Sequence, residues 1–243
     1  MKIISGVIVA FTFILFASCS DDTPSDPSKV ESFDFPLAIG NQWEMNFYDL
    51  DENHEPTGES NFTDTYLVTQ KLTYRGKEAY EVDDYTLQIK YLSKDNNAIY
   101  GHVDYESLSS DGKNYFPDEW MTFYSFAQDE WQIYTKQVTV EQEDYKATGT
   151  MTMTGKKTGN FSKEINGKTV KIYGFMGILN AVGTEISNGV ETKINQKDTT
   201  YYAIADSIGL YYVKEPDYPT EIDPSDYGRM FLLGDYSIKK TPF

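Results

Sequence analysis

Alternation of polar and apolar residues is the feature that most restricts how this chain can fold. It recurs in windows such as NFTDTYLVTQKLTY (61–74), EAYEVDDYTLQIKYLS (78–93) and TTYYAIAD (199–206). Side chains of a β-strand point alternately to its two faces, so a period of two predicts strands with one buried face. An apolar period of 3.6 residues, which would indicate an amphipathic helix, is not sustained over any window of about eleven residues.

Composition and turn signals agree with this interpretation. The chain holds 20 Tyr and 14 Phe, and aromatic and β-branched residues favour strands. RGKE (75–78) and KDNN (94–97) separate successive strand-like windows, and Gly and Asn tolerate the positive φ of tight hairpin turns. We therefore predict an all-β, mainly antiparallel fold with few short helices, the candidates being 118–127 and 224–228.

The N-terminus has the pattern of an export signal. Lys2 precedes an apolar run from Ile3 to Ala17, which is too short to span a bilayer comfortably. Phe16, Ala17 and Ser18 lead into Cys19, the single cysteine of the chain. This stretch resembles the lipobox of bacterial lipoproteins, which implies that Cys19 is lipidated and becomes the mature N-terminus. The alternative is an ordinary secreted or membrane-anchored protein with a chance cysteine.

The segment after the cysteine is polar and contains proline, so we expect residues 19–32 to form a flexible acidic tether between a signal peptide (1–18) and a single β domain (33–243). Ser20, Asp21 and Asp22 resemble the signal that sends Bacteroidetes-type lipoproteins to the cell surface. The expected location is the outer membrane, with the surface favoured over the periplasmic face.

The charge of the chain restricts its partners. A formal net charge of −17 argues against nucleic acid, because phosphate binding needs clustered Lys and Arg. The longest basic groupings are Lys156 with Lys157 and Lys239 with Lys240.

Two motifs near the ends of the domain resemble those of uncharacterised bacterial envelope lipoproteins. FPLAIGNQW (35–43) is similar to their opening PL-x-x-G-x-x-W, and TTYYAIADSIGLYYVKE (199–215) is similar to their closing strand pair. The resemblance implies a single curved sheet or half-barrel like that of the lipoprotein carrier LolA, which cradles lipid on an apolar face. From the residues themselves, we expect Gly40 and Asn41 to form a turn, Trp43 to be buried, and Gly209 to allow a bend or bulge.

Residues suited to catalysis or metal binding are few. His54 and His102 are the two histidines of the chain, which gives little support to a His-based triad or zinc site. Asp49, Asp51 and Asn53 have the spacing of a calcium loop, but His54 stands where that loop needs Gly, so we expect an exposed acidic hairpin. Acid pairs, such as 83 with 84, 129 with 130 and 217 with 221, keep a glycosidase-like enzyme as a distant third function. We expect no metal, no cofactor and no catalytic residue.

Aromatic residues supply the candidate ligand contacts. The segment from 115 to 131 concentrates seven of them, and those chosen as candidate contacts are Tyr115, Phe116, Trp120, Phe123 and Tyr124. They could form a packed loop or lid, close a pocket for an apolar ligand, or make a platform on which sugar rings stack. The expected function is thus a non-catalytic module that binds a lipid or other apolar ligand. The alternatives are a glycan-binding or adhesive protein and a scaffold for another envelope protein.

Two short segments of the chain resemble each other and suggest an internal repeat. FPLAIGNQW (35–43) and FYSFAQDEW (123–131) both place an aromatic residue eight positions before a Trp. The two segments are either a repeat or two unrelated strands that begin with a buried Trp.

Overall fold

The computed structural model describes residues 34–83, 89–103, 117–142, 145–217 and 226–239. These residues belong to one compact unit. They form strands and no helix, which confirms the all-β, antiparallel prediction, and none of them lies in a helix long and apolar enough to cross a membrane.

Twelve strands follow one another along the described chain, and all pairs of neighbours are antiparallel. They are β1 (Gln42–Asp49), β2 (Phe62–Tyr74), β3 (Lys77–Asp83), β4 (Ile89–Lys94), β5 (Ala98–Val103), β6 (Met121–Ser125), β7 (Glu130–Gln142), β8 (Tyr145–Ile165), β9 (Lys168–Ser187), β10 (Val190–Ala205), β11 (Gly209–Pro216) and β12 (Gly228–Ser237).

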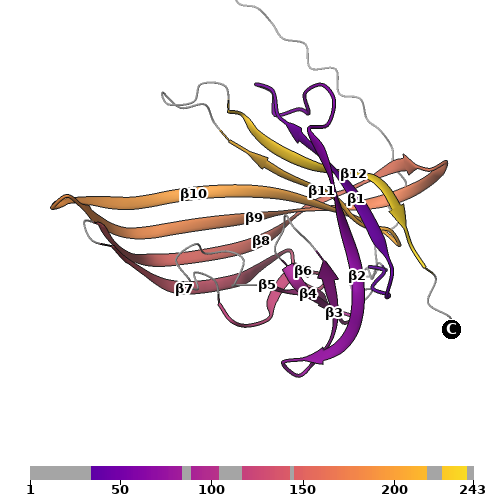
Figure 1. Ribbon diagram of the computed structural model, residues 1–243, viewed down its shortest axis with the longest axis horizontal. Coiled ribbons are helices and arrows are strands. Elements are labelled where there is room, and N and C mark those ends of the chain that lie inside the picture. Colours follow the sequence, from indigo (N-terminus) through magenta and orange to yellow (C-terminus); the bar gives the residue numbers. More distant parts are fainter. Residues whose placement is uncertain (1–33, 84–88, 104–116, 143–144, 218–225, 240–243) are drawn as a thin grey trace, which may run out of the picture. The chain divides into compact units, whose positions relative to one another are not determined.

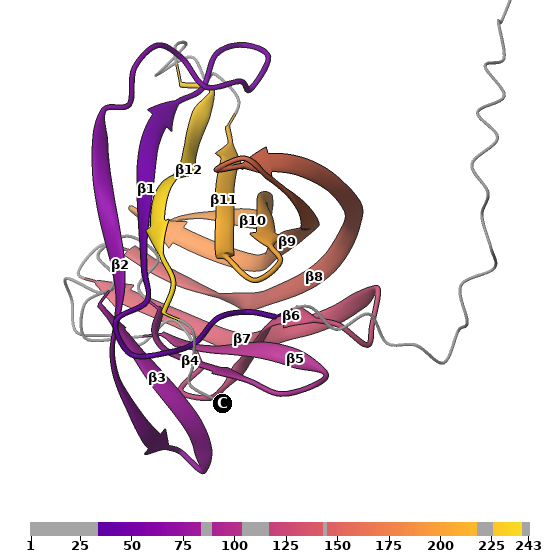
Figure 2. The same cartoon turned by 90° about the vertical axis from the view of Figure 1, so that its right-hand side faces the viewer.

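One sheet contains all twelve, in the order β6-β5-β4-β3-β2-β1-β12-β11-β10-β9-β8-β7. Each pair of neighbours is consecutive in the chain except β1 and β12, which join the two ends of the chain in the middle of the sheet. The sheet curls until its edge strands β6 and β7 approach each other, giving a nearly closed barrel (Figure 2). The indole N–H of Trp131 in β7 donates to the carbonyl of Thr122 in β6 at 2.9 Å, so the two edges meet near the turn that connects them.

The second half of the sheet extends beyond the barrel. Strands β8, β9 and β10 have 21, 20 and 16 residues, and with β7 they form a four-stranded ribbon that extends past the other strands (Figure 1). We call residues 135–142, 145–154 and 177–199 the ribbon.

The turn between β2 and β3 agrees with the sequence, whereas one predicted helix does not. Arg75 and Gly76 both have positive φ in the turn between β2 and β3, as predicted for RGKE. The predicted helix at 118–127 is wrong, because residues 121–125 form β6 and pair with β5. The partner strand determines the structure here, since short aromatic segments carry little intrinsic preference. The other helix candidate, 224–228, lies partly outside the described residues, and its last residue begins β12.

The core is aromatic, and two tryptophans are set into it in the same way. Trp43 and Trp131 are both buried, at 3% and 4% exposure. A Cβ at Gly209 would overlap the ring of Trp43, and a Cβ at Gly155 would overlap the ring of Trp131. The indole N–H of Trp43 donates to the carbonyl of Ile208. Each ring therefore fills the space left by a glycine and finds a backbone acceptor, as buried indoles require.

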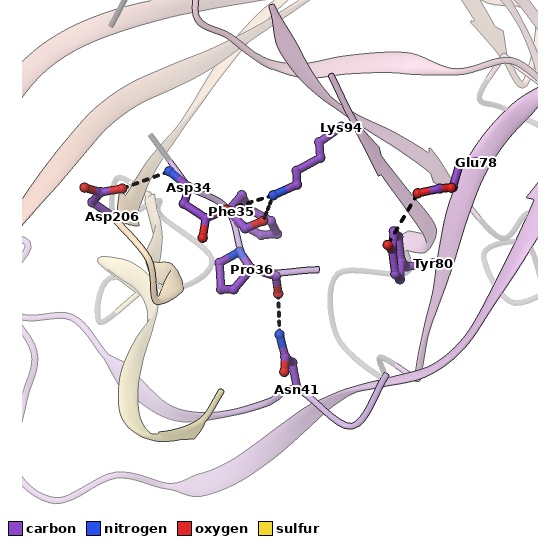
Figure 3. Close-up of polar contacts among 8 residues, drawn as sticks. All are labelled: Asp34, Phe35, Pro36, Asn41, Glu78, Tyr80, Lys94 and Asp206. Atoms are coloured by element: carbon purple, nitrogen blue, oxygen red, sulfur yellow. Dashed lines mark hydrogen bonds and ion pairs between the residues drawn. The ribbon is translucent and has the colours of Figure 1, made fainter. Parts of the chain in front are cut away.

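Residues 34–41 precede β1 and are hydrogen-bonded to β4, to the turn before β11 and within the segment itself (Figure 3). Lys94 of β4 donates to the side chain of Asp34 at 2.9 Å and to the carbonyl of Phe35 at 2.6 Å. The backbone N–H of Asp34 donates to Asp206 in the turn before β11, and Asn41 donates to the carbonyl of Pro36. Because Phe35 is buried in the core, we call this segment, which carries the PL-x-x-G motif, the plug.

Candidate functional site

Inward-facing side chains change from apolar to polar along the barrel axis, away from the plug. On β1 the sequence of alternate residues is Trp43, Met45, Phe47 and Asp49, of which the first three belong to or pack against the core. The antiparallel register places Phe231 of β12 opposite Phe47 and Arg229 opposite Asp49. Since alternate residues of a strand share a face, the interior becomes polar at the end of the barrel opposite the plug.

This end of the barrel opens into a pocket of about 500 Å³, which we call the polar mouth. It is formed where β1, β11 and β12 meet β10, at the point where β10 continues into the ribbon. Its lining comprises Phe47, Asp49, Asp198, Thr199, Thr200, Glu215, Pro216, Asp217, Asp226, Gly228 and Arg229.

Negative charge dominates the polar mouth, which has five carboxylates and a single guanidinium. Arg229 donates from Nε to Glu215 at 2.5 Å. Neutral groups hold three of the other carboxylates in place: Asn61 donates to Asp49, Gln196 donates to Asp198, and the backbone N–H of Gly228 donates to Asp226. Each of these three carboxylates therefore has a hydrogen-bond donor within the protein.

A second, much smaller cavity of about 50 Å³ lies inside the barrel and has an apolar lining. Its lining comprises Phe35, Trp43, Tyr66, Val82, Ile89, Leu92, Ile99, Phe123, Ile204 and Leu210. An apolar cavity of about 150 Å³ accepts a benzene ring, so this one has no room for an acyl chain without rearrangement.

The predicted contact aromatics do not form one surface. Tyr115, Phe116 and Cys19, the predicted lipidation residue, lie outside the described residues. Phe123 lines the apolar cavity and meets Tyr202 edge-on, with ring centroids 5.3 Å apart.

The other two described candidates, Tyr124 and Trp120, do not line the apolar cavity. Tyr124 is 2% exposed and packs against Phe175 and Trp131. Trp120 is half-buried and contacts the rings of Tyr74 and His102. Among the described candidates, the aromatic rings therefore serve packing, and none of them lines the polar mouth.

Trp120 belongs to an aromatic cluster with Tyr74, Tyr91 and His102. Tyr74 and Tyr91 stack with centroids 4.1 Å apart, and His102 meets Tyr74 edge-on at 5.0 Å. His102 is 3% exposed, and its Nε2 lies 3.3 Å from Asp118, which also pairs with Arg75. Burial lowers the pKa of His102, and Asp118 partly opposes this effect. The cluster fixes residues 118–120 to the sheet.

The acidic segments have structural roles that the sequence only partly indicated. Asp51 accepts hydrogen bonds from the backbone N–H groups of Glu55 and Asn53, which lower its pKa. Leu50 and Pro56 bridge to close the predicted acidic hairpin. Within the described ranges, no three Asp, Glu, His or Cys side chains are close enough together to hold a metal ion.

Sequence reasoning missed the polar mouth as a site. Asp49 and Asp217 attracted notice, but as parts of a calcium-like loop and of an acid pair. The mouth combines four segments that are up to about 180 residues apart in the chain, and the pairing of β1 with β12 brings the first of them to the other three. No family model, no curated protein and no solved structure matches the chain significantly.

Proposed function

We propose that this protein is a lipid-anchored, non-catalytic binding module that holds a hydroxyl-rich ligand, a glycan, in the polar mouth. The observation that carries the proposal is the contrast between the two hollows. The polar mouth has about ten times the volume of the apolar cavity and is lined mainly by hydrogen-bonding groups. Ligand sites in proteins are commonly concave, with an apolar wall and a few well-placed polar groups.

The chemistry of the lining suits a sugar. A carboxylate has several acceptor sites and can receive hydrogen bonds from two neighbouring hydroxyls, whereas a Thr hydroxyl can donate or accept. Asp49 and Asp198 supply such carboxylates, and Thr199 and Thr200 supply the hydroxyls. Phe47 adds an apolar wall against which the C–H groups of a sugar ring can pack.

Calorimetric titration would test this assignment on the chain from Ser20 onward, which retains the compact unit. The probes are neutral, acidic and amino-sugar polysaccharides and their oligosaccharides. Asp49→Asn keeps the size and the acceptor for Asn61 but removes the charge, and we expect it to weaken binding about tenfold or more, because hydrogen bonds to charged groups are the strong ones. Thr200→Val should also weaken binding.

Glu191→Gln is the matched control. Glu191 is an exposed carboxylate of the ribbon, and its substitution should leave binding unchanged. The glycan proposal fails if none of the probes binds, or if Asp49→Asn and Thr200→Val bind as tightly as the natural chain.

The anchor is a separate part of the proposal and has its own test. Support comes from the resemblance of the residues before Cys19 to a lipobox and from the acidic residues that follow. A single acyl chain holds a protein to a membrane only marginally, whereas several chains hold it firmly. We expect Cys19→Ala to abolish acylation and to move the protein out of the outer-membrane fraction. Unchanged membrane retention would refute lipidation.

An apolar ligand is the second candidate, and the apolar cavity is the observation that favours it. This candidate corresponds to the LolA-like resemblance, in which lipid lies inside a curved sheet. Because the cavity has about 50 Å³, an acyl chain would have to displace core side chains such as Phe123 or Leu92. Native mass spectrometry of gently purified protein would show a bound lipid as added mass, and apo mass with no uptake from a lipid panel would exclude it.

A further inference from the structure

One hairpin of this acidic chain is basic. Residues 159–171 form the end of β8, the start of β9 and the turn between them, and they carry three lysines and one glutamate. Their formal charge is therefore +2, whereas the whole chain has a formal charge of −17. We call this segment the basic hairpin. It lies at the end of β8 and β9 that is opposite to the ribbon (Figure 1).

Two lysines and an exposed aromatic ring share one face of the basic hairpin. Phe161, Lys163 and Ile165 are alternate residues of β8, and alternate residues point to the same face. Lys168 of β9 is paired with Ile165 and therefore points to this face as well. The side chain of Phe161 is 44% exposed, and both lysines are exposed. The glutamate of the hairpin, Glu164, points to the other face, so this face combines positive charge with apolar surface.

The charge of these two lysines is available to a partner. Among the described residues, no carboxylate forms an ion pair with Lys163 or Lys168. Lys157, which precedes the hairpin on β8, differs because its ammonium lies 3.5 Å from a carboxylate oxygen of Asp129. An unpaired cluster of one sign of charge attracts ligands of the opposite sign. The basic hairpin therefore suits an anionic partner.

The basic hairpin also lies next to the residue at which the described chain begins. The backbone N–H of Asp206 donates to the carbonyl of Lys171, the last residue of the hairpin, at 2.9 Å. The side chain of Asp206 in turn accepts from the backbone N–H of Asp34 at 2.9 Å. Fourteen residues separate Asp34 from Cys19, and such a length of chain spans at most about 50 Å. A lipid anchor at Cys19 would therefore hold the hairpin within reach of the membrane.

We propose that the basic hairpin binds the anionic headgroups of the membrane that carries the lipid anchor. Each lysine near an anionic surface strengthens binding about fivefold, and an aromatic ring can enter the interface beside the headgroups. A lipid surface is favoured over free phosphate because Phe161 adds apolar surface next to the lysines. The anchor would raise the effective concentration of the hairpin at the membrane, so that a few contacts suffice.

This contact determines how the barrel is oriented. The plug contains Asp34 and lies beside the basic hairpin, so this end of the barrel faces the membrane. The polar mouth lies at the opposite end, and it then faces away from the membrane, where a large glycan can reach it. The inference rests on the proposed anchor for this orientation, but it does not depend on the identity of the ligand in the polar mouth.

Lysine acetylation on vesicles would test the contact in the anchored geometry. The chain from Cys19 onward, which retains the compact unit, is coupled to a maleimide lipid through this cysteine, the single one of the sequence. The vesicles contain either phosphatidylcholine alone or equal parts of phosphatidylcholine and phosphatidylglycerol. Mass spectrometry then measures the acetylation rate of each lysine. We expect the rates of Lys163 and Lys168 to fall about fivefold or more on the anionic vesicles, and added salt to reverse this fall.

Lysines of the ribbon are the internal control. Lys193 and Lys197 are exposed residues of β10, and their acetylation rates should be the same on both kinds of vesicle. Lys163→Gln removes one of the two charges and should restore most of the acetylation of Lys168 on anionic vesicles. Lys193→Gln, the matched change on the ribbon, should leave the acetylation of Lys168 slow. Circular dichroism would verify that the variants fold.

A second pair of variants tests the apolar contribution. Phe161→Thr should speed the acetylation of Lys168 on anionic vesicles, because the ring no longer enters the interface. Val190→Thr is the matched control, since Val190 is a 65% exposed apolar residue of the ribbon, and it should have no effect. If Lys163→Gln and Phe161→Thr both left Lys168 as slow as in the natural chain, the hairpin would not be the contact.

Other outcomes would also overturn the proposal. Equal acetylation of Lys163 and Lys168 on the two kinds of vesicle would exclude the contact, and equal slowing of the ribbon lysines would show that it is not specific. Slowing by inorganic phosphate on neutral vesicles would indicate a site for the free ion instead of a lipid surface. Because the coupling is chemical, the result is independent of natural lipidation, which the Cys19→Ala fractionation tests separately.

Discussion

The two halves of the sheet, β1–β6 and β7–β12, begin alike and end differently. Each half opens with a strand whose second residue is a tryptophan, Trp43 in β1 and Trp131 in β7. Each ring covers a glycine of another strand and donates to a backbone carbonyl. The strands of the first half have 5 to 13 residues, whereas β8 and β9 have 20 or more and extend as the ribbon.

The difference shows that a tryptophan packed on a glycine can determine where a strand begins but does not determine the length of that strand. The tryptophans anchor both halves to the core at their first strands. Beyond that point, strand length depends on whether a neighbour of equal length continues the ladder, as β8, β9 and β10 do for one another from Tyr145 to Thr200.

The largest expected effect comes from filling the space beneath a tryptophan. A Cβ at Gly209 would lie 2.6 Å from the indole nitrogen of Trp43, and Gly209 has a φ of +115°. Gly209→Ala combines backbone strain with overpacking, so it should lower the free energy of unfolding by about 3 kcal/mol or more. Gly155→Ala should cost less, about 1–3 kcal/mol, because overpacking acts there without a positive φ. Urea denaturation followed by Trp fluorescence measures both.

Gly189→Ala provides the control for the backbone contribution. Gly189 has a φ of +78° with open space around it, so its substitution should cost about 1–2 kcal/mol, the penalty of the left-handed conformation alone. Equal losses for Gly189→Ala and Gly209→Ala would contradict the role given to Trp43.

Removal of the indole donors should have the next largest effect. Trp43→Phe leaves the carbonyl of Ile208 buried without its partner and should cost about 2–3 kcal/mol. Trp131→Phe should cost about 1–2 kcal/mol, because its bond to Thr122 is only partly buried. Thermal unfolding of the two variants would compare the halves directly, and a greater loss for Trp131→Phe would reverse the expected order.

A smaller effect depends on pH and belongs to the first half, which contains both histidines. The pKa of His102 is lowered by burial in the folded protein, so the unfolded chain binds a proton first as the pH falls. Above the ordinary His pKa of about 6.5 the group contributes nothing to this dependence, and below it the free energy of unfolding falls. His102→Gln should flatten the dependence between pH 7 and 5, measured by urea denaturation. The comparison variant His54→Gln, in the hairpin 50–56, should retain it.

The smallest effect is expected on the ribbon. Val182 is 58% exposed, and Val182→Thr should change the free energy of unfolding by less than about 0.5 kcal/mol. Val213, at 1% exposure, offers the contrast within the same half, because Val213→Thr would bury a hydroxyl in the core at about 1–3 kcal/mol. If the two substitutions lowered the free energy of unfolding equally, the face of the ribbon that carries Val182 would have to be covered.

Local sequence predicted the features that depend on neighbouring residues. The alternation indicated sheet, Gly40 has the expected positive φ, and Trp43 is buried as proposed. Gly209 lies beside an irregularity in the β10–β11 ladder, as expected for a bend or bulge. The extra residue there is Tyr211, so Leu210 and Val213 both contribute to the core, and simple alternation fails locally.

Features that depend on distant pairing could not be predicted. Nothing near β1 indicates that β12 is its partner, and this pairing creates the polar mouth. The segment 121–125 has aromatic residues compatible with helix or strand, and its pairing with β5 decides between them. Of the candidate aromatics that the structure describes, Tyr124 packs in the core, Phe123 lines the apolar cavity and Trp120 packs against Tyr74 and His102. Their role as ligand contacts stays a prediction.

The pairing of β1 with β12 also sets the order in which the barrel can form. Hairpins between consecutive strands close short loops, whereas β1 and β12 are separated by almost the whole domain. Their pairing therefore has the largest loop-closure entropy cost in the sheet, and we expect it to form last. Until β12 (228–237) pairs with it, β1 is an edge strand, although it lies in the middle of the complete sheet. The last strand is therefore the joint between two six-stranded halves, and a chain shortened at that point would lose the barrel itself.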